Sequence, residues 1–465
     1  MNYDAFVASK LALPVATGIP DPVMPEEGLF PFQKVVSSWA CKRGRAAIFA
    51  STGLGKSRMG AAWAQNVATH TGRDVIAFAP LAVAKQFRGE AARVGVEVTV
   101  CREEKDLRPG INVTNYERMD KFQPDRFSGV LIDEGSIIKH FDSATFRELC
   151  SRYSETPFRL SMTATPAPND WMELGCQAEF LGICKRTEML SEFFVHDGGD
   201  TSVWRLKGHA RGAFWQWVAS WAALVSHPRD LGVEFDQPGY DLPPLRLHEH
   251  VIPVDAEQAR AAGLLFVEEA RGLMEQRQAR KASLSKRVEA CARLVNADDD
   301  RWIVWSNLNA ESEALREAIR GSVEVTGSQD VDTKERIIEE FVDGKHRVLD
   351  SKSSICGHGL NLQFVKKMAF VGMDNSWEQW FQAIRRIWRF GQTEPCDIHV
   401  FVSEAEGAVL ENVKAKDAAA KEMAEALARE TREAVRANVI GTKRTTVAYE
   451  PQKTMRLPSW LGSRS

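Results

Sequence analysis

Four side chains in the segment QAIRRIWRFGQ, residues 382–392, have types that suit a phosphate ligand. On a helix their spacing of i, i+3, i+4 and i+7 puts them on one face. They are Gln382, Arg385, Arg386 and Arg389. The opposite face is apolar and consists of Ala383, Ile384, Ile387 and Trp388. Guanidinium suits phosphate because its planar donors match phosphate oxygens and its charge persists. The segment therefore predicts a buried helix that presents a basic face to one anion; the alternative is an amphipathic surface helix with solvated arginines.

A second candidate phosphate site is the segment STGLGKS, residues 51–57. An apolar run with strand character precedes it and a helical run follows, which is the setting of a phosphate-binding loop. Glycines let the backbone approach the phosphates, and loop amides with the helix N-terminus attract the anion. The strict pattern has glycine where Ala50 stands, so the loop is a variant, and a chance match is the alternative. The predicted nucleotide contacts are Thr52, Gly53, Leu54, Gly55, Lys56 at the β- and γ-phosphates, and Ser57, whose hydroxyl would bind Mg²⁺.

Two carboxylates end the apolar run GVLIDE, residues 129–134. Downstream of a phosphate-binding loop, Asp133 is in the position to hold Mg²⁺ through water. Glu134 would then orient or deprotonate the attacking water. The alternative is a pair of solvated acids at a strand end. Together with the loop, the pair predicts ATP and Mg²⁺ as ligands.

These three segments belong to a longer series of motifs in a fixed order. They are FPFQKVV (30–36), STGLGKS (51–57), FAPLAVAKQF (78–87), VTNYE (113–117), IDEGSIIKH (132–140), SMTATPAPND (161–170), WIVWSNLNAESEAL (302–315), VTGSQDVDTKER (325–336) leading to SKSSICGHGLNLQ (351–363), and QAIRRIWRFGQTEP (382–395). In order and letters the chain resembles a superfamily-two helicase of the DEAD/DEAH-box kind. Within that superfamily it is most similar to the Snf-type DNA translocases, in their compact phage- or prophage-encoded form.

The resemblance implies an α/β fold with two RecA-like parallel-sheet domains in tandem, helical insertions, and an ATP cleft between the domains. It implies that Gln33 reads adenine, with an ordinary surface glutamine as the alternative. It also implies that Arg386 and Arg389 act as arginine fingers beside Gln382. Gly359 would allow a close backbone approach at the interface, unless it is a simple turn glycine.

Three positions depart from the family pattern. Ser136 stands where a histidine often links the nucleotide to the next motif, so the route of coupling is open. Trp388 replaces a common histidine, and Arg385 replaces a common acid. None of these changes removes a residue to which the resemblance assigns ATP chemistry.

Duplex DNA is the expected partner. Contacts to phosphates carry no sequence information, so binding is expected to be sequence-tolerant and salt-sensitive. The candidate contacts are Pro80, Thr114, Asn115, Thr163 and Thr165 on the first domain, and Ser306, Thr326, Lys352 and Ser353 on the second. A strand-separating DNA or RNA helicase remains an alternative. So does a nucleotide-gated clamp or loading module for nucleic acid or protein that hydrolyses ATP weakly.

The elements that must position these residues divide the chain into five parts. An approach segment covers 1–28, and a first domain covers 29–234 with a helical insertion at about 186–232. The prolines of FDQPGYDLPPL indicate a linker at 235–250. A second domain with a leading helical segment covers 251–430, and a tail covers 431–465. Trp215, Trp217 and Trp221 are expected to pack in a core, with base stacking as the alternative.

Composition limits the remaining classes. The 465 residues carry a net charge of −3, so any basic surface is local. Eight cysteines without a CxxC pair make zinc unlikely and fit reduced thiols. The chain shows neither a signal peptide nor a long apolar run, so a cytoplasmic, non-membrane protein of a bacterial or phage-infected cell is expected. A monomer is expected, with LPSWL (457–461) as a tail that could dock a protein partner.

Overall fold

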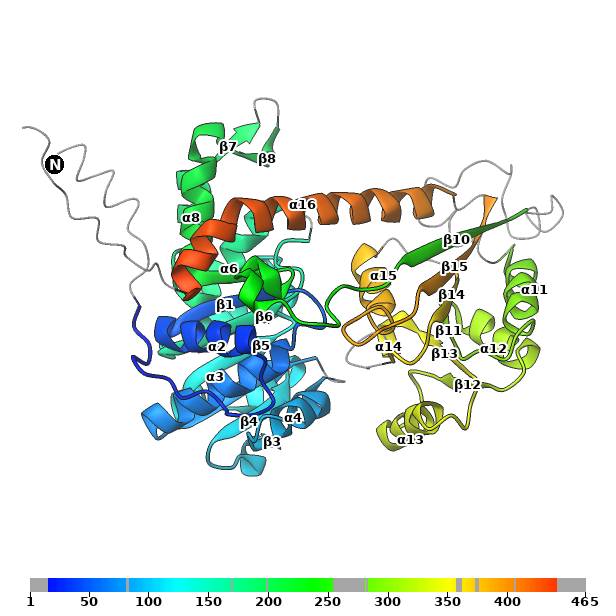
Figure 1. The fold of residues 1–465 in the computed structure, drawn as a ribbon, viewed down its shortest axis with the longest axis horizontal. Helices are drawn as coiled ribbons and strands as arrows, with labels where there is room; N and C mark the ends of the chain where they lie inside the picture. Colours follow the sequence, from blue (N-terminus) through cyan, green and yellow to red (C-terminus); the bar gives the residue numbers. More distant parts are fainter. Residues whose placement is uncertain are drawn as a thin grey trace, which may run out of the picture.

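Two α/β domains lie side by side in the computed structural model, and a long C-terminal helix spans both (Figure 1). The structure describes residues 16–80, 83–168, 170–197, 200–253, 281, 283–356, 362–372, 376–404 and 407–440. Gly359, residues 254–280 and the LPSWL segment lie outside the described residues. Within the described part, no helix is both long and apolar enough to cross a membrane.

The first domain is built on a seven-stranded parallel sheet with the order β3-β4-β2-β5-β6-β1-β9. Its strands are β1 (Arg45–Ala50), β2 (Asp74–Ala79), β3 (Val98–Val100), β4 (Ile111–Asn115), β5 (Phe127–Asp133), β6 (Phe158–Thr163) and β9 (Ala222–Val225). Its helices are α2 (Pro31–Arg43), α3 (Lys56–Thr71), α4 (Ala84–Ala92), α5 (Ala144–Arg152) and α6 (Leu174–Leu181). Every residue of β5 and β6 is buried, as expected when helices cover both faces of a parallel sheet.

The second domain is built on a six-stranded parallel sheet with the order β10-β15-β14-β11-β13-β12. Its strands are β10 (Leu245–Ile252), β11 (Trp302–Ser306), β12 (Ser322–Val325), β13 (Val348–Lys352), β14 (Lys367–Val371) and β15 (Cys396–Ser403). Its helices are α11 (Leu284–Val295), α12 (Asn309–Ala318), α13 (Val331–Val342), α14 (Ser353–Cys356), α15 (Trp377–Ile384) and α16 (Gly407–Ile440). The predicted fold class, two parallel-sheet α/β domains in tandem, is confirmed.

The sequence predicted a helical insertion in the first domain, but the insertion is only partly helical. Between α7 (Arg186–Phe193) and α8 (Arg211–Trp221) runs an antiparallel hairpin of β7 (Phe194–Asp197) and β8 (Asp200–Leu206). The insertion then ends in β9, which is the seventh strand of the first sheet. The run AALV is apolar and follows α8 directly, so it gains more by pairing with β1 than by extending the helix. Trp215 and Trp221 are buried in this region, consistent with core packing.

The arginine segment also departs from its predicted form. Helix α15 ends at Ile384, and residues 385–392 continue as turns. Tertiary hydrogen bonds explain this ending, because the Arg386 carbonyl accepts from the Leu362 amide at 3.0 Å. The Ile387 carbonyl accepts from Gln392 Nε2 at 3.3 Å, and Gly391 has a φ of 89°. These bonds replace the helical ladder, so the arginines do not share one helical face.

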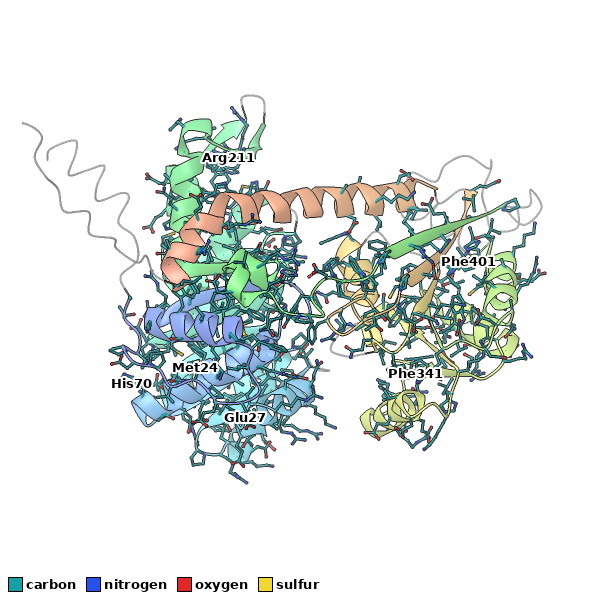
Figure 2. The ribbon with its side chains drawn as sticks, in the orientation of Figure 1. Met24, Glu27, His70, Arg211, Phe341 and Phe401 are labelled. Carbon is teal, nitrogen blue, oxygen red and sulfur yellow. The ribbon has the colours of Figure 1, made fainter. Side chains whose placement is uncertain are left out.

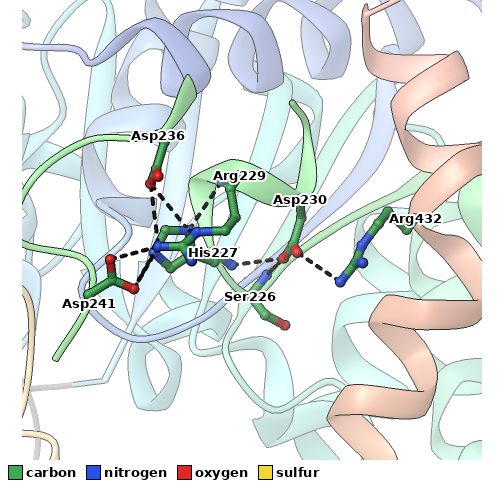
Figure 3. Close-up of polar contacts among 7 residues, drawn as sticks. All are labelled: Ser226, His227, Arg229, Asp230, Asp236, Asp241 and Arg432. Atoms are coloured by element: carbon green, nitrogen blue, oxygen red, sulfur yellow. Dashed lines mark hydrogen bonds and ion pairs between the residues drawn. The ribbon is translucent and has the colours of Figure 1, made fainter. Parts of the chain in front are cut away.

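A polar network binds the chain that joins the two domains to the end of the first sheet (Figure 3). Arg229 lies between the carboxylates of Asp241, at 2.6 Å, and Asp236, at 3.6 Å, and its Nε donates to His227 Nδ1 at 3.1 Å. This guanidinium already supplies the positive charge that a metal ion would bring to the three side chains. Strand β10 begins at Leu245, within the range predicted as linker, and α16 continues to Ile440, past residue 430.

Candidate functional site

A cavity of about 230 Å³ lies between the two domains. It is lined by the first domain, the connecting chain, α15 with the turns that follow it, and the loop at Gln363. The lining residues are Phe30, Gln33, Thr52, Gly53, Gly55, Lys56, Ser57, Arg58, Val83, Gln86, Glu90, Arg93, Asp133, Glu134, Tyr240, Gln363, Gln382, Arg386, Arg389 and Phe390. Most of the residues predicted to bind or hydrolyse ATP therefore line one cavity, although they lie far apart in the sequence.

The loop between β1 and α3 has the backbone that its glycines predict. Gly53 and Gly55 have φ values of 92° and 79°, which a side chain would strain. Lys56 opens α3, and its Nζ donates to the Ala50 carbonyl at 2.8 Å. Burial lowers the pKa of Lys56, while the charges of Glu134 and Asp133 oppose that shift. The ammonium group is thus held inside the cavity next to the place where phosphates would lie. Leu54 is buried and does not line the cavity.

The acidic pair follows the carboxyl end of β5. Ser57 Oγ donates to Asp133 Oδ2 at 3.4 Å, so the two predicted metal ligands face each other. Burial raises the pKa of Asp133 to about 7, and the neighbouring charge of Glu134 adds to the shift. Glu134 has a φ of 53°, and its buried Oε2 has no hydrogen-bond partner. A buried Asp133 beside a buried, unpartnered oxygen of Glu134 fits a cation, so these residues suit a divalent metal.

Two of the three arginines reach the cavity. Arg386 is buried, and its guanidinium donates to the backbone and side-chain oxygens of Gln382, both at 3.1 Å. Burial lowers the pKa of Arg386 to about 10 and also lowers the pKa of Arg389. Arg385 lies elsewhere, with its guanidinium carbon 4.5 Å from the Trp388 ring centre and 5.0 Å from that of Phe381. The prediction that Arg385 shares the basic face is therefore wrong.

An aromatic wall completes one end of the cavity, and sequence reasoning missed two of its members. Phe390 packs on Tyr240 with ring centres 4.4 Å apart and on Phe30 at 5.8 Å. Beside this wall, Gln33 Nε2 donates to the Leu54 carbonyl at 2.9 Å. A Cβ added to Gly53 would lie 3.0 Å from the Phe390 amide nitrogen, so the two domains touch here. Phe390 follows Arg389 directly and could have been found by that adjacency, whereas Tyr240 lies in a linker that carries no motif.

A second contact joins the domains behind the acidic pair. Glu378 on α15 accepts from Ser136 Oγ at 3.0 Å and pairs with Lys139 Nζ at 2.6 Å. Ser136 lies two residues after Glu134, at the position where the family pattern often has a histidine. The segment after β5 thus contacts directly the helix that leads to Arg386.

The candidate nucleic-acid residues gather at the carboxyl ends of strands in both sheets. Thr114, Asn115, Thr163 and Ser306 end β4, β6 and β11 and are buried, as is Thr165. Pro80, Thr326, Lys352 and Ser353 are partly exposed near the ends of β2, β12 and β13. The carboxyl edge is where open α/β sheets bind ligands, but burial leaves few of these side chains accessible for direct contact.

Comparison with known proteins supports the second half of this arrangement. Residues 286–391 match the family model described as helicase conserved C-terminal domain. The predicted resemblance to helicases is confirmed over this range, which runs from α11 to the turns that carry Arg386, Arg389 and Phe390. Across the shared cavity, the matched range faces the loop that contains Lys56 and Ser57.

The chain was also compared with curated proteins and with solved structures. No curated protein matches the sequence. Among solved structures, the SWI2/SNF2 ATPase core of Sulfolobus solfataricus in complex with dsDNA is 16% identical. Its match covers 90% of this chain and 98% of that chain, with a TM-score of 0.42.

Proposed function

We propose that the chain is a double-stranded DNA translocase of the Snf type, driven by ATP hydrolysis in the cavity between its domains. The observation that carries this proposal is the meeting of Lys56, Glu134 and Arg389 around one cavity, although they come from different domains. ATP chemistry needs a phosphate cradle, a water-orienting acid and an arginine, and these three residues are suited to those roles.

Each side chain has a distinct task in this proposal. Lys56 and the loop amides hold the β- and γ-phosphates, while Gln33, Phe30, Tyr240 and Phe390 surround the base. Ser57 and Asp133 would hold Mg²⁺, which when bound neutralises charge that develops on the phosphates. The unpartnered carboxylate oxygen of Glu134 is available to orient water.

The arginines couple hydrolysis to domain closure. Arg386 and Arg389 belong to the second domain, so they reach the γ-phosphate only while the cleft is closed. An arginine supplied in this way contributes about 10³- to 10⁵-fold in rate. Closure and opening then alternate with the nucleotide state, and two domains that grip DNA phosphates in turn would move along the duplex.

The ATPase rate measured with different nucleic acids tests this function. We expect stimulation by duplex DNA of mixed sequence that falls steeply with salt. Blunt duplex, single-stranded DNA and RNA of equal length are compared at saturating ATP, with Lys56→Ala as the inactive control. Stimulation by RNA alone would contradict the duplex-DNA assignment. A rate that no nucleic acid changes would contradict the motor and favour a nucleotide-gated clamp.

A further inference from the structure

A second hollow, of about 360 Å³, lies in the insertion of the first domain and shares no residue with the nucleotide cavity. Its walls are the β7–β8 hairpin, the start of α8 and the loop at Asp170. The hairpin projects from the body of the domain beyond α8, and Arg211 lies at its base (Figures 1 and 2). The loop at Asp170 continues from Thr165 at the carboxyl edge of the sheet. No step of ATP hydrolysis uses this hollow.

Aromatic rings form its floor and one wall. Trp215 and Phe194 are buried, and Trp171 meets Trp215 edge-on with ring centres 4.8 Å apart. Trp204 on β8 remains partly exposed and lies against the His196 ring at 3.7 Å between centres. Two of the tryptophans therefore keep part of their surface for a flat apolar partner.

Positive charge surrounds the aromatic floor. Arg205 and Arg211 are exposed at the rim. Lys207 is held in place because its Nζ donates to the carbonyls of Ser191 and Glu192, at 2.9 and 2.8 Å. The acid in the lining, Asp170, accepts from the Met172 amide at 2.8 Å, and burial raises its pKa. The hollow is thus lined by three cations and by one carboxylate that already accepts a hydrogen bond. This excess of positive charge favours an anionic partner.

We propose that this hollow binds an unpaired nucleotide of a single-stranded segment next to the duplex on which the motor acts. A partly exposed indole stacks on a base, and nearby arginines contact the flanking phosphates, as in proteins that bind single strands. Bases in an intact duplex are stacked inside it and offer no free face, so the partner is an unpaired end, gap or branch. The proposal rests on the proposed function and narrows its substrate to DNA with a single-strand–duplex junction.

Fluorescence anisotropy with the full chain compares two labelled probes, a blunt duplex and the same duplex with a single-stranded tail. The parent should bind the tailed probe more tightly. Arg205→Glu combined with Arg211→Glu should weaken tailed binding about tenfold and change blunt binding less than about twofold. Trp204→Ala should weaken tailed binding to a similar extent, because the indole that stacks on the base is removed. The control is Arg147→Glu, a single reversal of the same kind at an exposed position of α5 in the same domain, and it should behave as the parent.

The outcomes separate this inference from the proposed function. If the variants lose equal affinity for both probes, or lose none for either, the proposed role of the hollow is refuted. The proposal of a nucleic-acid-stimulated ATPase would remain intact. A parent that prefers neither probe, but is still stimulated by duplex DNA, would also overturn it. A parent whose ATPase responds to no nucleic acid would refute the motor itself. Thermal melts of each variant identify misfolding, and the two independent chemistries, charge and ring, keep the test decisive if one variant fails to fold.

Discussion

At the residue scale, the arginines that follow α15 show how neighbours can have unrelated roles. Arg386 and Arg389 line the nucleotide cavity, whereas Arg385 lies over the rings of Trp388 and Phe381. A cation over an aromatic face contributes about 0.5–2 kcal/mol to stability and nothing to phosphate chemistry. The segment therefore combines two arginines that we propose contact ATP with one arginine that packs on aromatic rings.

Substituting Arg389 and Arg385 separately tests that division. We expect Arg389→Ala to bind ATP nearly as the parent does and to lose at least about 10³-fold in turnover, because the transition-state charge lacks its partner. Arg385→Ala should keep turnover within a few-fold and lower the melting temperature. ATP binding is measured by calorimetry and turnover by phosphate release. Parent-like hydrolysis by Arg389→Ala would exclude the finger role.

At the element scale, the edge strand β10 is held partly by a row of histidines. His248 pairs in register with His399 of β15, and their rings stack at 4.5 Å. His250 Nε2 lies 3.0 Å from His399 Nδ1. Burial lowers the pKa of His399 to about 4, and the charges of His248, His250 and Lys367 add to the shift, while Asp397 opposes it.

Acid should therefore loosen this edge. A histidine whose folded pKa lies below its unfolded value stabilises the fold above pH 6.5, and that stability is lost as the pH falls towards 4. We expect the melting temperature of the parent to drop over this window more steeply than that of His399→Gln, which retains a polar group and cannot take a charge. His209→Gln, at an exposed histidine, is the control. Superimposable pH profiles for the parent and His399→Gln would rule out this role.

At the scale of the whole molecule, α16 ties the two domains together (Figure 1). Its first turns place Leu410 and Val413 in the core of the second domain. Its last turns place Val435 in the core of the first, and Arg432 pairs with Asp230 at 3.3 Å (Figure 3). A helix anchored at both ends limits how far the domains can separate while the cleft opens.

Releasing one anchor should uncouple the domains. We expect Val435→Asp to split a single calorimetric unfolding transition into two, because a carboxylate in the core detaches α16 from the first domain. Arg436→Asp changes the adjacent exposed position and should leave one transition. If Val435→Asp still unfolds in the same single transition as Arg436→Asp, α16 does not couple the domains.

Local patterns in the sequence were sufficient for the phosphate-binding loop, the acidic pair and the alternation of strands and helices. Each depends on a few adjacent residues, such as Gly53 and Gly55 or an apolar run before Asp133, whose physics is local. Ordered motifs also indicated a resemblance to helicases, and residues 286–391 match a family model of the helicase C-terminal domain. Local patterns could not predict contacts between residues that lie far apart in the sequence.

Tertiary structure alone decided where α15 ends, because the Leu362 amide donates to the Arg386 carbonyl that a continuing helix would use. It also brought Tyr240 and Phe390 to the cavity, and turned a predicted helical insertion into a hairpin with a strand of the main sheet. In each case the deciding partner lies far along the chain. Hydrogen bonding and burial depend on that partner, and no local spacing of residues records its position.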